Sequence, residues 1–180
     1  HVAAARRELG VRTIFNLLGP LVNPALVERQ VVGIYAPDLL ETYARVLLTL
    51  GSRRALVVCG EDGMDELSLC APTMLCRAEA GGILHRERVT PESAGLARCA
   101  PADLAGGDAV QNAAALEAAL GGRPGPQLDA TLFNAAAALL VAERVGDLRE
   151  GVETARNCVR SGAAAKVLER LRARKREAAA

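Results

Sequence analysis

Residues 29–59 read RQVVGIYAPDLLETYARVLLTLGSRRALVVC and hold three segments of different pattern. The apolar run over 29–35 is typical of a buried strand. Residues 37–50 start with Pro-Asp and repeat apolar side chains near the i, i+3, i+4 spacing of one helix face. Gly51 ends this helix, and 54–59 is a second apolar run. Strand, helix and strand at this spacing predict a βαβ unit, in which the two strands are parallel.

The chain continues with a segment of different periodicity. Residues 73–89 alternate between polar and apolar positions around Gly81 and Gly82, which predicts an antiparallel hairpin. From residue 101 onward the pattern is helical. We expect helices from Asp108 to about Leu120, over roughly 128–144, from Asp147 to about Arg160, and over a basic segment at the end of the chain.

The beginning of the chain has its own pattern. Residues 2–9 suit a helix that ends at Gly10, and 11–24 form an apolar run stiffened by two prolines. Together the segments predict an α/β fold in a single domain over residues 1–180. Its sheet is expected to be mostly parallel and flanked by helices, with a short antiparallel hairpin.

Composition limits the classes of function. About half of the 180 residues are apolar, about a quarter are charged, and the formal net charge is +1. Near-neutral charge and scarce aromatic residues argue against nucleic acid as a partner. No apolar run reaches the roughly eighteen residues that cross a bilayer, so no membrane partner is expected. Five scattered cysteines predict reduced thiols in a cytoplasmic protein. Because the sequence begins with His1 and not Met, we expect it to be part of a longer chain.

Residues 60–69 read GEDGMDELSL and follow the second predicted strand, where open α/β sheets usually bind their ligands. Adjacent Asp65 and Glu66 present the hard oxygen atoms that Mg²⁺ prefers, while leaving coordination positions for water and phosphate. Both can face one ion only if the backbone kinks, and Gly60 and Gly63 supply that freedom. A solvated acidic turn explains the same residues, and the spacing alone leaves both interpretations open. The segment contains four carboxylates: Glu61, Asp62, Asp65 and Glu66.

Other polar residues have structural as well as functional interpretations. Arg6, in AAARRELG, can make a bidentate contact with a carboxylate, although a surface arginine explains it equally. His85 is expected at the surface of the hairpin. Asn134 interrupts the apolar stretch LFNAAAALL and is expected to be a buried amide bonded to the backbone. No arrangement typical of nucleophilic catalysis is present, so no catalytic side chain is predicted.

Longer strings of sequence resemble a known family. RRELGVRTIFNLLGPLVNP, VVCGEDGMDELS, GGDAVQNAAALEAAL, LFNAAAALL and LREGVETAR occur in this order between residue 1 and about 168. This series is similar to the C-terminal part of the anthranilate phosphoribosyltransferase family. The resemblance implies the C-terminal α/β domain type of nucleoside phosphorylases and phosphoribosyltransferases. It also implies transfer of phosphoribose from phosphoribosyl pyrophosphate to anthranilate, in tryptophan biosynthesis.

The same resemblance implies roles for particular residues. Arg6 would contact the carboxylate of anthranilate, and Pro20, in the LLGP string, would line the route of this acceptor. Asp65 and Glu66 would hold Mg²⁺ on the pyrophosphate leaving group. The family's GTGGD phosphate loop and its small helical domain, through which the family forms homodimers, do not occur in these 180 residues. We therefore expect the chain to be inactive alone.

Two alternatives to this function remain open. The first is a non-catalytic, nucleic-acid-binding relative of the same fold, which is supported by the basic C-terminal helix. The second is a pyrimidine-nucleoside phosphorylase of related architecture, although the GEDG-DELS string favours the anthranilate enzyme. The basic side chains of this helix are Arg170, Arg172, Arg174, Lys175 and Arg176.

Overall fold

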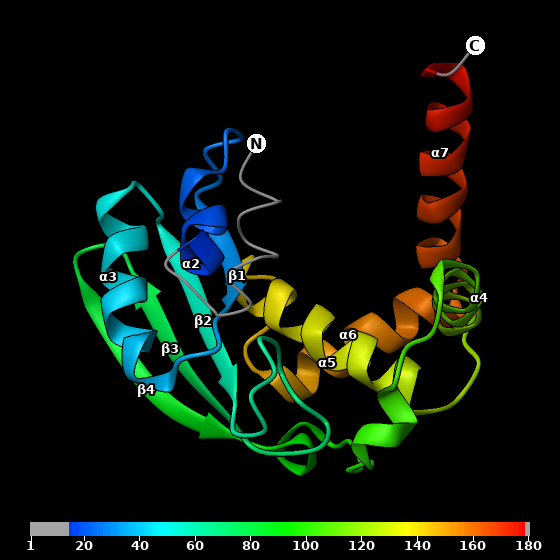
Figure 1. Ribbon diagram of the computed structural model, residues 1–180, viewed down its shortest axis with the longest axis horizontal. Coiled ribbons are helices and arrows are strands. Elements are labelled where there is room, and N and C mark those ends of the chain that lie inside the picture. Colours follow the sequence, from blue (N-terminus) through cyan, green and yellow to red (C-terminus); the bar gives the residue numbers. More distant parts are fainter. Residues whose placement is uncertain (1–14, 179–180) are drawn as a thin grey trace, which may run out of the picture.

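The computed structural model describes residues 15–178, with side chains for 17–175. Its sheet has the strand order β1-β2-β3-β4, and all four strands are visible on the left of Figure 1. The predicted strands and hairpin are confirmed. The strands are β1 (Arg29–Gly33), β2 (Arg54–Gly60), β3 (Thr73–Glu79) and β4 (Ile83–Val89).

The sheet is mixed in direction. The βαβ prediction is confirmed, since β1 pairs with β2 in parallel and Val32 lies opposite Val57. However, β2 pairs with β3 and β3 with β4 in antiparallel fashion, so the α/β class is confirmed while a mostly parallel arrangement is wrong for the described strands. The reason is the connection between β2 and β3. It is a short loop with no crossover helix, so the chain turns back and the hairpin extends the same sheet.

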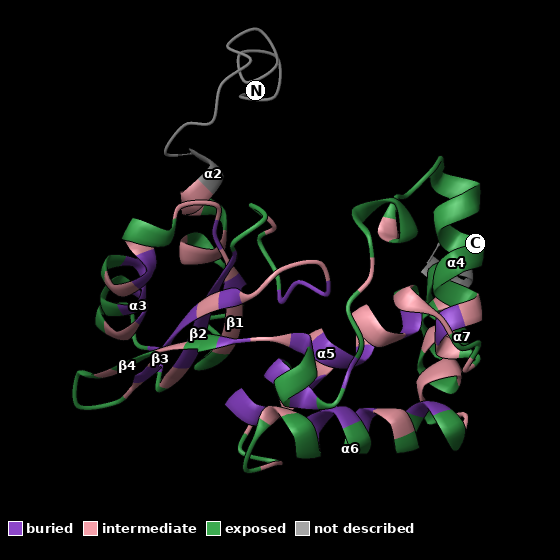
Figure 2. Ribbon diagram, turned by 90° about the horizontal axis from the view of Figure 1, so that it is seen from below, coloured by how far each residue is buried: buried purple, intermediate pink, exposed green. Residues whose placement is uncertain are grey.

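Each face of the sheet is covered by helices, because side chains along a strand point alternately to opposite faces. On one face, Val57 and Cys76 pack beneath α3 (Leu40–Thr49), which follows a 3₁₀ turn, η2 (Pro37–Leu39). On the other face, Leu56 and Leu75 pack against the core that α5 (Pro126–Val141) and α6 (Leu148–Arg160) complete. Figure 2 shows buried residues along the strands and along facing sides of α5 and α6.

In the second half of the chain, α4 and α6 begin directly after the residues that were predicted to cap them. Asp108 and Asp147 each accept a hydrogen bond from a backbone N–H three residues later, at 2.8 Å, and cap α4 (Ala109–Leu120) and α6. The basic helix is α7 (Ala163–Ala178). Two 3₁₀ turns, η3 (Pro91–Ala94) and η4 (Pro101–Leu104), lead from the sheet to these helices.

The first described residues also form short helices. The described part of the stiff apolar run contains α2 (Phe15–Leu18) and a 3₁₀ turn, η1 (Gly19–Val22). Tyr43 Oη on α3 donates a hydrogen bond to the Leu17 carbonyl oxygen, at 2.6 Å, and holds this segment against the sheet layer. The helix predicted over 2–9, with Gly10, lies outside the described residues.

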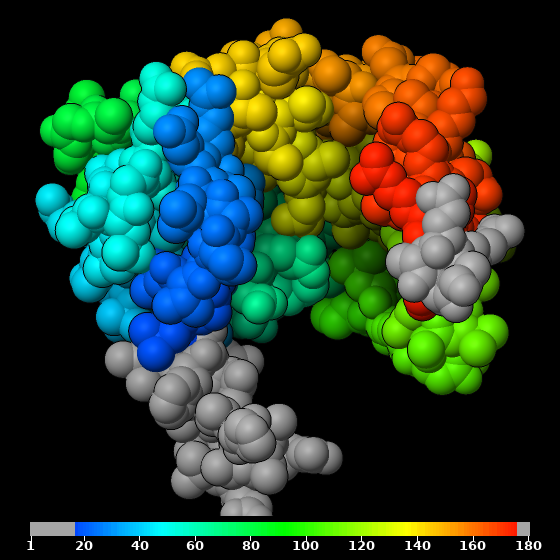
Figure 3. Space-filling view, turned by 90° about the horizontal axis from the view of Figure 1, so that it is seen from above, coloured from blue at the N-terminus to red at the C-terminus, as the bar shows by residue number. Residues whose placement is uncertain are grey.

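The arrangement leaves one side of the molecule open. Figure 1 shows the sheet and α3 on one side, α4 and α7 on the other, and α5 and α6 connecting them. The space-filling view in Figure 3 shows a notch between these two sides. Of the helices in residues 15–178, none has the length and apolar character that crossing a bilayer requires.

Candidate functional site

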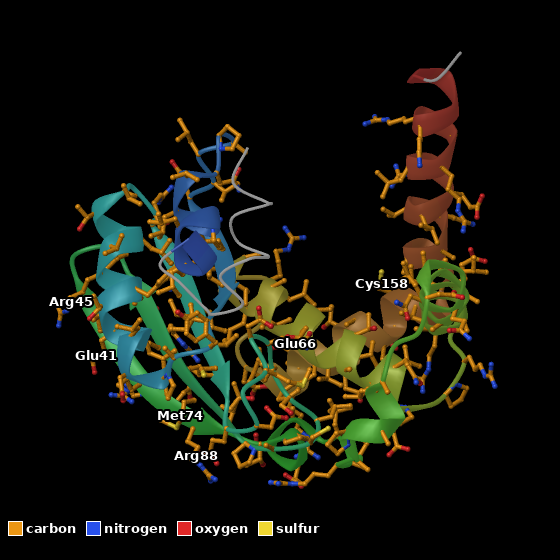
Figure 4. The ribbon with its side chains drawn as sticks, in the orientation of Figure 1. Glu41, Arg45, Glu66, Met74, Arg88 and Cys158 are labelled. Atoms are coloured by element: carbon orange, nitrogen blue, oxygen red, sulfur yellow. The ribbon has the colours of Figure 1, made fainter. Side chains whose placement is uncertain are left out.

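The acidic segment predicted to bind a metal is a loop, residues 61–72, which we call the acidic loop. It begins at the carboxyl end of β2 and returns the chain to β3. Figure 4 shows Glu66 on this loop, between the sheet and the helices on the other side. This is the position that sequence order predicted.

Two glycines shape the start of the acidic loop. The Gly60 N–H donates to the Met64 carbonyl oxygen at 2.8 Å, and the Gly63 N–H donates to the Gly60 carbonyl oxygen at 2.9 Å. Gly63 has φ +87°, a left-handed conformation that glycine adopts without strain. The backbone bends again at Asp65 and Glu66. On an extended segment the side chains of Asp65 and Glu66 would point to opposite faces. Because the backbone bends here, both can face one ion.

The four carboxylates of the loop divide into two that are paired and two that are not. Arg88 Nε and Nη2 donate to the two carboxylate oxygens of Glu61 at 2.6 and 2.9 Å, and this pairing holds the pKa of Glu61 below its ordinary value. Ser68 Oγ donates to Asp62 Oδ2 at 2.5 Å. Among the residues that the structure describes, neither Asp65 nor Glu66 has an ion pair or a side-chain hydrogen bond. The loop therefore presents two unpaired acids side by side.

The electrostatic environment of Glu66 favours an added cation. Glu66 is an exposed residue of the acidic loop. Partial burial nevertheless raises the pKa of Glu66 above its ordinary value, and the negative charges of Asp65 and Asp62 raise it further. Like charges held together without a neutralising partner cost free energy, and a bound cation would remove that cost.

Asn134 fixes the loop immediately after these two acids. Its Oδ1 accepts a hydrogen bond from the Leu67 N–H at 2.9 Å, and its Nδ2 donates to the Leu67 carbonyl oxygen at 3.1 Å. Nδ2 also donates to the Ala130 carbonyl oxygen, one turn earlier in α5, at 3.1 Å. The expected bonding of this amide to the backbone is confirmed, although Asn134 is half-buried rather than buried. Its partner, sixty-seven residues away in the sequence, gave no signal in the sequence pattern.

Gly33 supports the loop from the sheet side. A Cβ atom placed on Gly33 would overlap the Asp65 carbonyl oxygen and lie 3.0 Å from the Asp65 Cα. The backbone of the loop therefore rests directly on the end of β1. Sequence analysis missed this contact, since Gly33 appeared as an ordinary residue of an apolar strand.

Pro20 lies elsewhere in the described structure. It is half-buried in η1 and lines a small cavity of about 40 Å³ with, among others, Gln30 at the start of β1 and Ser52 before β2. Gly33 and the acidic loop are at the opposite ends of these strands, and Gly33 lies about 10 Å beyond Gln30 at the usual rise per residue. The described residues thus do not bring Pro20 next to Asp65 and Glu66. Arg6 lies outside the described residues.

The remaining polar residues have structural roles or are exposed. His85 lies exposed on β4, as expected. The Gly106-Gly107-Asp108 string forms the loop and cap at the start of α4. Within residues 15–178 no cluster of three or more histidine, cysteine, aspartate or glutamate side chains is arranged to hold a metal. Any metal at Asp65 and Glu66 would need further ligands from water or substrate.

Comparison with known proteins identifies the family. The model of the glycosyl transferase family, a/b domain, matches residues 1–165. The chain belongs to this family. This glycosyl transferase a/b domain is 52% identical over 172 residues to an anthranilate phosphoribosyltransferase of Symbiobacterium thermophilum, a match that covers 96% of the chain and 50% of the relative. It is also 52% identical over 171 residues to the Methylocella silvestris enzyme, covering 95% of the chain and 49% of the relative.

Solved structures agree with this assignment. The a/b domain matches anthranilate phosphoribosyltransferase from Thermus thermophilus with a TM-score of 0.84 and 43% identity, over 94% of this chain and 50% of that one. It matches the Saccharomyces cerevisiae enzyme in complex with PRPP and Mg with a TM-score of 0.81 and 28% identity, over 94% and 49%. The expected resemblance and fold are confirmed, and the chain spans about half the length of these relatives.

The two unpaired acids fit the metal that the resemblance implies. Mg²⁺ binds hard oxygen ligands and usually keeps several waters, so one or two carboxylates together with substrate phosphates suffice to hold it. Asp65 and Glu66 supply such oxygens on a bent backbone, without competing protein cations among the described residues. The donor set therefore suits Mg²⁺ bound jointly with a phosphate ligand.

Proposed function

We propose that this a/b domain is part of an anthranilate phosphoribosyltransferase, and that its acidic loop forms the magnesium-binding wall of the phosphoribosyl pyrophosphate site. The observation that carries the proposal is the pair of unpaired carboxylates, Asp65 and Glu66. Their neighbours Glu61 and Asp62 are already occupied by Arg88 and Ser68. Identity of about one half to enzymes of this name supports the choice of reaction.

The proposed reaction depends more on holding the two substrates in position than on acid–base catalysis. Anthranilate displaces pyrophosphate at the anomeric carbon, and negative charge grows on the leaving group as the glycosidic C–O bond breaks. A bound Mg²⁺ supplies electrostatic stabilisation of that charge. Asp65 and Glu66 would orient the leaving group, while Asn134 and Gly33 hold the loop in place. The absence of a predicted catalytic base is compatible with such a mechanism.

The acceptor side of the site stays a prediction. Arg6 would bind the carboxylate of anthranilate by paired hydrogen bonds, and Pro20 would line its route. The homodimer, formed through a part of the relatives that this chain does not match, and the cytoplasmic location also stay predictions. Because half of the positioning groups would come from that part, we expect the 180-residue chain alone to be inactive.

The nucleic-acid alternative receives less support. Its basic helix, α7, uses Arg172 in ion pairs with Glu117 on α4 and with Glu169 on α7 itself. A guanidinium already paired with two carboxylates is less available to a phosphate backbone. Nothing in the described residues adds aromatic side chains to this helix. We therefore favour the transferase.

The metal site can be tested on the chain as it stands. We expect Mn²⁺, used as a paramagnetic probe for Mg²⁺, to broaden the amide NMR signals of the acidic loop. The double variant Asp65→Ala, Glu66→Ala should abolish this broadening. Glu61→Gln removes one carboxylate from the same loop and is the matched control, with affinity changed by less than about threefold because this exposed charge is screened. Equal broadening in all three proteins would contradict the metal site.

The reaction requires a longer protein. A chimera can join the first half of the Symbiobacterium thermophilum relative to this chain, and pyrophosphate release can be measured with anthranilate, phosphoribosyl pyrophosphate and Mg²⁺. We expect activity in the chimera, and a loss on the order of 100-fold or more in its Asp65→Ala, Glu66→Ala form. The Glu61→Gln form should keep most of the activity. An active chimera that tolerates the double change would refute the proposed role of these acids.

A further inference from the structure

Two cysteines meet at the end of the acidic loop. Cys70 lies in the loop, four residues after Glu66, and Cys99 lies between η3 and η4. Their Sγ atoms are 3.8 Å apart, which is van der Waals contact between thiols. A disulfide requires an S–S separation of about 2.0 Å. Movement of the two side chains by about 2 Å in total would therefore join them.

The backbone already holds the two residues together. The Cys99 N–H donates a hydrogen bond to the carbonyl oxygen of Leu69, the residue before Cys70, at 3.3 Å. Both side chains are partly exposed. The pair is thus accessible to a small reagent from solvent and needs no rearrangement of the sheet or of α5.

The other three cysteines lie in different surroundings. Cys59 and Cys76 are buried in the core beneath α3. Cys158 is exposed on α6, as Figure 4 shows, far along the chain from the acidic loop. The structure gives a sulfur–sulfur contact for Cys70 and Cys99, so this pair is the candidate for covalent chemistry.

We propose that Cys70 and Cys99 form a dithiol that glutathione disulfide closes to an intramolecular disulfide. The Cys70 thiolate attacks one sulfur of glutathione disulfide, forms a mixed disulfide and releases one glutathione. The Cys99 thiolate then attacks Cys70 Sγ, forms the Cys70–Cys99 bond and releases the second glutathione. Two protein thiols lose two electrons and two protons, and one glutathione disulfide is reduced to two glutathione thiols.

The order of attack follows from the surroundings of Cys99. Burial, its contact with Cys70, and the carboxylates of Asp103 and Asp129 raise the pKa of Cys99 to about 11. Its thiolate is therefore scarce near neutral pH, which disfavours a first attack by Cys99. Once Cys70 is in a mixed disulfide it carries no charge, and its contribution to that raised pKa disappears. Ring closure should still be slow at neutral pH and accelerate as the pH rises.

A Cys70–Cys99 disulfide would restrain the acidic loop through short hydrogen bonds. The N–H groups of Cys70 and Ala71 donate to Ser68 Oγ at 2.9 and 3.2 Å, and Ser68 Oγ in turn donates to Asp62. A bridge at Cys70 thus fixes the end of the segment that carries Asp65 and Glu66. In a reducing compartment the pair stays a dithiol, and oxidation would tie the loop to the segment before η4.

The test uses the full chain carrying Cys158→Ser, which removes the exposed thiol that would link two molecules. The protein is incubated with glutathione disulfide over a range of pH, free thiols are alkylated, and linked peptides are identified by mass spectrometry. We expect two fewer alkylated thiols, a link between the peptides that contain Cys70 and Cys99, and reversal by a dithiol reductant. The thermal midpoint should rise by roughly 5–10 °C on closure.

Single variants assign the two sulfurs. In the same background, Cys99→Ser should stop at a mixed disulfide on Cys70, and Cys70→Ser should form no intramolecular bond. Cys99→Ala serves as a second variant if the serine disturbs packing, and circular dichroism checks the fold of each. If all thiols of the background protein are alkylated after oxidation, or if Cys99→Ser still forms an intramolecular disulfide from Cys70 to another cysteine, the proposal is wrong.

Discussion

Asn134 illustrates how one side chain can fix a site that it does not line. Its amide satisfies both the N–H and the carbonyl group of Leu67, directly after Glu66, and is itself oriented by the Ala130 carbonyl oxygen. A primary amide is suited to this role because it has a donor and an acceptor at one end. A carboxylate at this position would accept from the N–H but would repel the carbonyl oxygen.

We predict that Asn134→Ala weakens both the fold and the candidate metal site. Two backbone groups of Leu67 lose their partner, which should lower the free energy of unfolding by about 2 kcal/mol. Mn²⁺ affinity should fall although Asp65 and Glu66 are unchanged, because the loop is no longer fixed. Urea unfolding and Mn²⁺ titration monitored by NMR measure the two effects.

Asn112→Ala is the matched control for this change. Asn112 also bonds a backbone N–H and carbonyl group, those of Gly107, but it does so in an exposed loop before α4. Its loss should cost no more than about 1 kcal/mol, because water replaces the partner, and should leave Mn²⁺ binding intact. Similar losses in the two variants would show that Asn134 has no special role at the loop.

At the scale of elements, local signals in the sequence predicted most of the fold. Asp108 and Asp147 predicted the starts of α4 and α6, and Gly81 with Gly82 predicted the hairpin turn. Such signals work because capping and turn formation depend on a few neighbouring residues. The predicted strand directions were partly wrong. Whether two strands pair in parallel or antiparallel fashion depends on how the connection between them folds, and no local pattern determines that.

Local signals of the same kind indicated the candidate site, whose role in metal binding stays a prediction. The residue types of Asp65 and Glu66 and their place after a strand indicated a metal site. The supports of the loop could not be predicted, since Asn134, Gly33 and Cys99 reach it from elements remote in the sequence. A single sequence carries no record of such contacts.

The junction between β1 and the acidic loop is the element-scale feature that we expect to be most sensitive. In Gly33→Ala, the added methyl group would overlap the backbone of Asp65, which cannot move aside as a flexible side chain would. We predict a loss of roughly 2 kcal/mol or more in the free energy of unfolding and a marked loss of Mn²⁺ binding. Urea unfolding and Mn²⁺ titration measure both quantities.

Gly19→Ala provides the comparison at the other end of the sheet. A Cβ atom on Gly19 would meet no atom within 4 Å, so the substitution should change stability by less than about 1 kcal/mol. Normal Mn²⁺ binding in Gly33→Ala would mean that the loop can shift without consequence for the metal site, and the support assigned to β1 would be withdrawn.

At the scale of the whole molecule, the two cores on either side of the sheet contain, or are contacted by, buried and half-buried groups that ionise at high pH. Burial raises the pKa of Cys76 and of Tyr43 in the core beneath α3. Glu41 raises the pKa of Cys76 further, whereas Arg86 and Arg45 oppose the rise. On the other side of the sheet, the pKa of Cys99 is raised to about 11. These shifts link the stability of the fold to pH.

The sign of this linkage is the same for all three groups. Each has a higher pKa in the folded than in the unfolded protein, so above the ordinary cysteine value of 9.0 the folded protein holds more protons. Their contribution to stability is complete below that pH and is lost as the pH rises through the folded values. We predict that the free energy of unfolding falls steadily between about pH 9 and pH 11, and urea unfolding under reducing conditions measures it.

The variant Cys76→Ala tests how much this thiol contributes to the pH dependence of stability, separately from Tyr43 and Cys99. The variant should be less stable than the parent near neutral pH, by about 1 kcal/mol for the small cavity, yet its stability should fall less steeply above pH 9. Cys158→Ser replaces an exposed thiol and should follow the parent at every pH. The buried thiol beneath α3 would have no part in the alkaline loss if Cys76→Ala and the parent declined in parallel, because its ionisation would then not be coupled to unfolding.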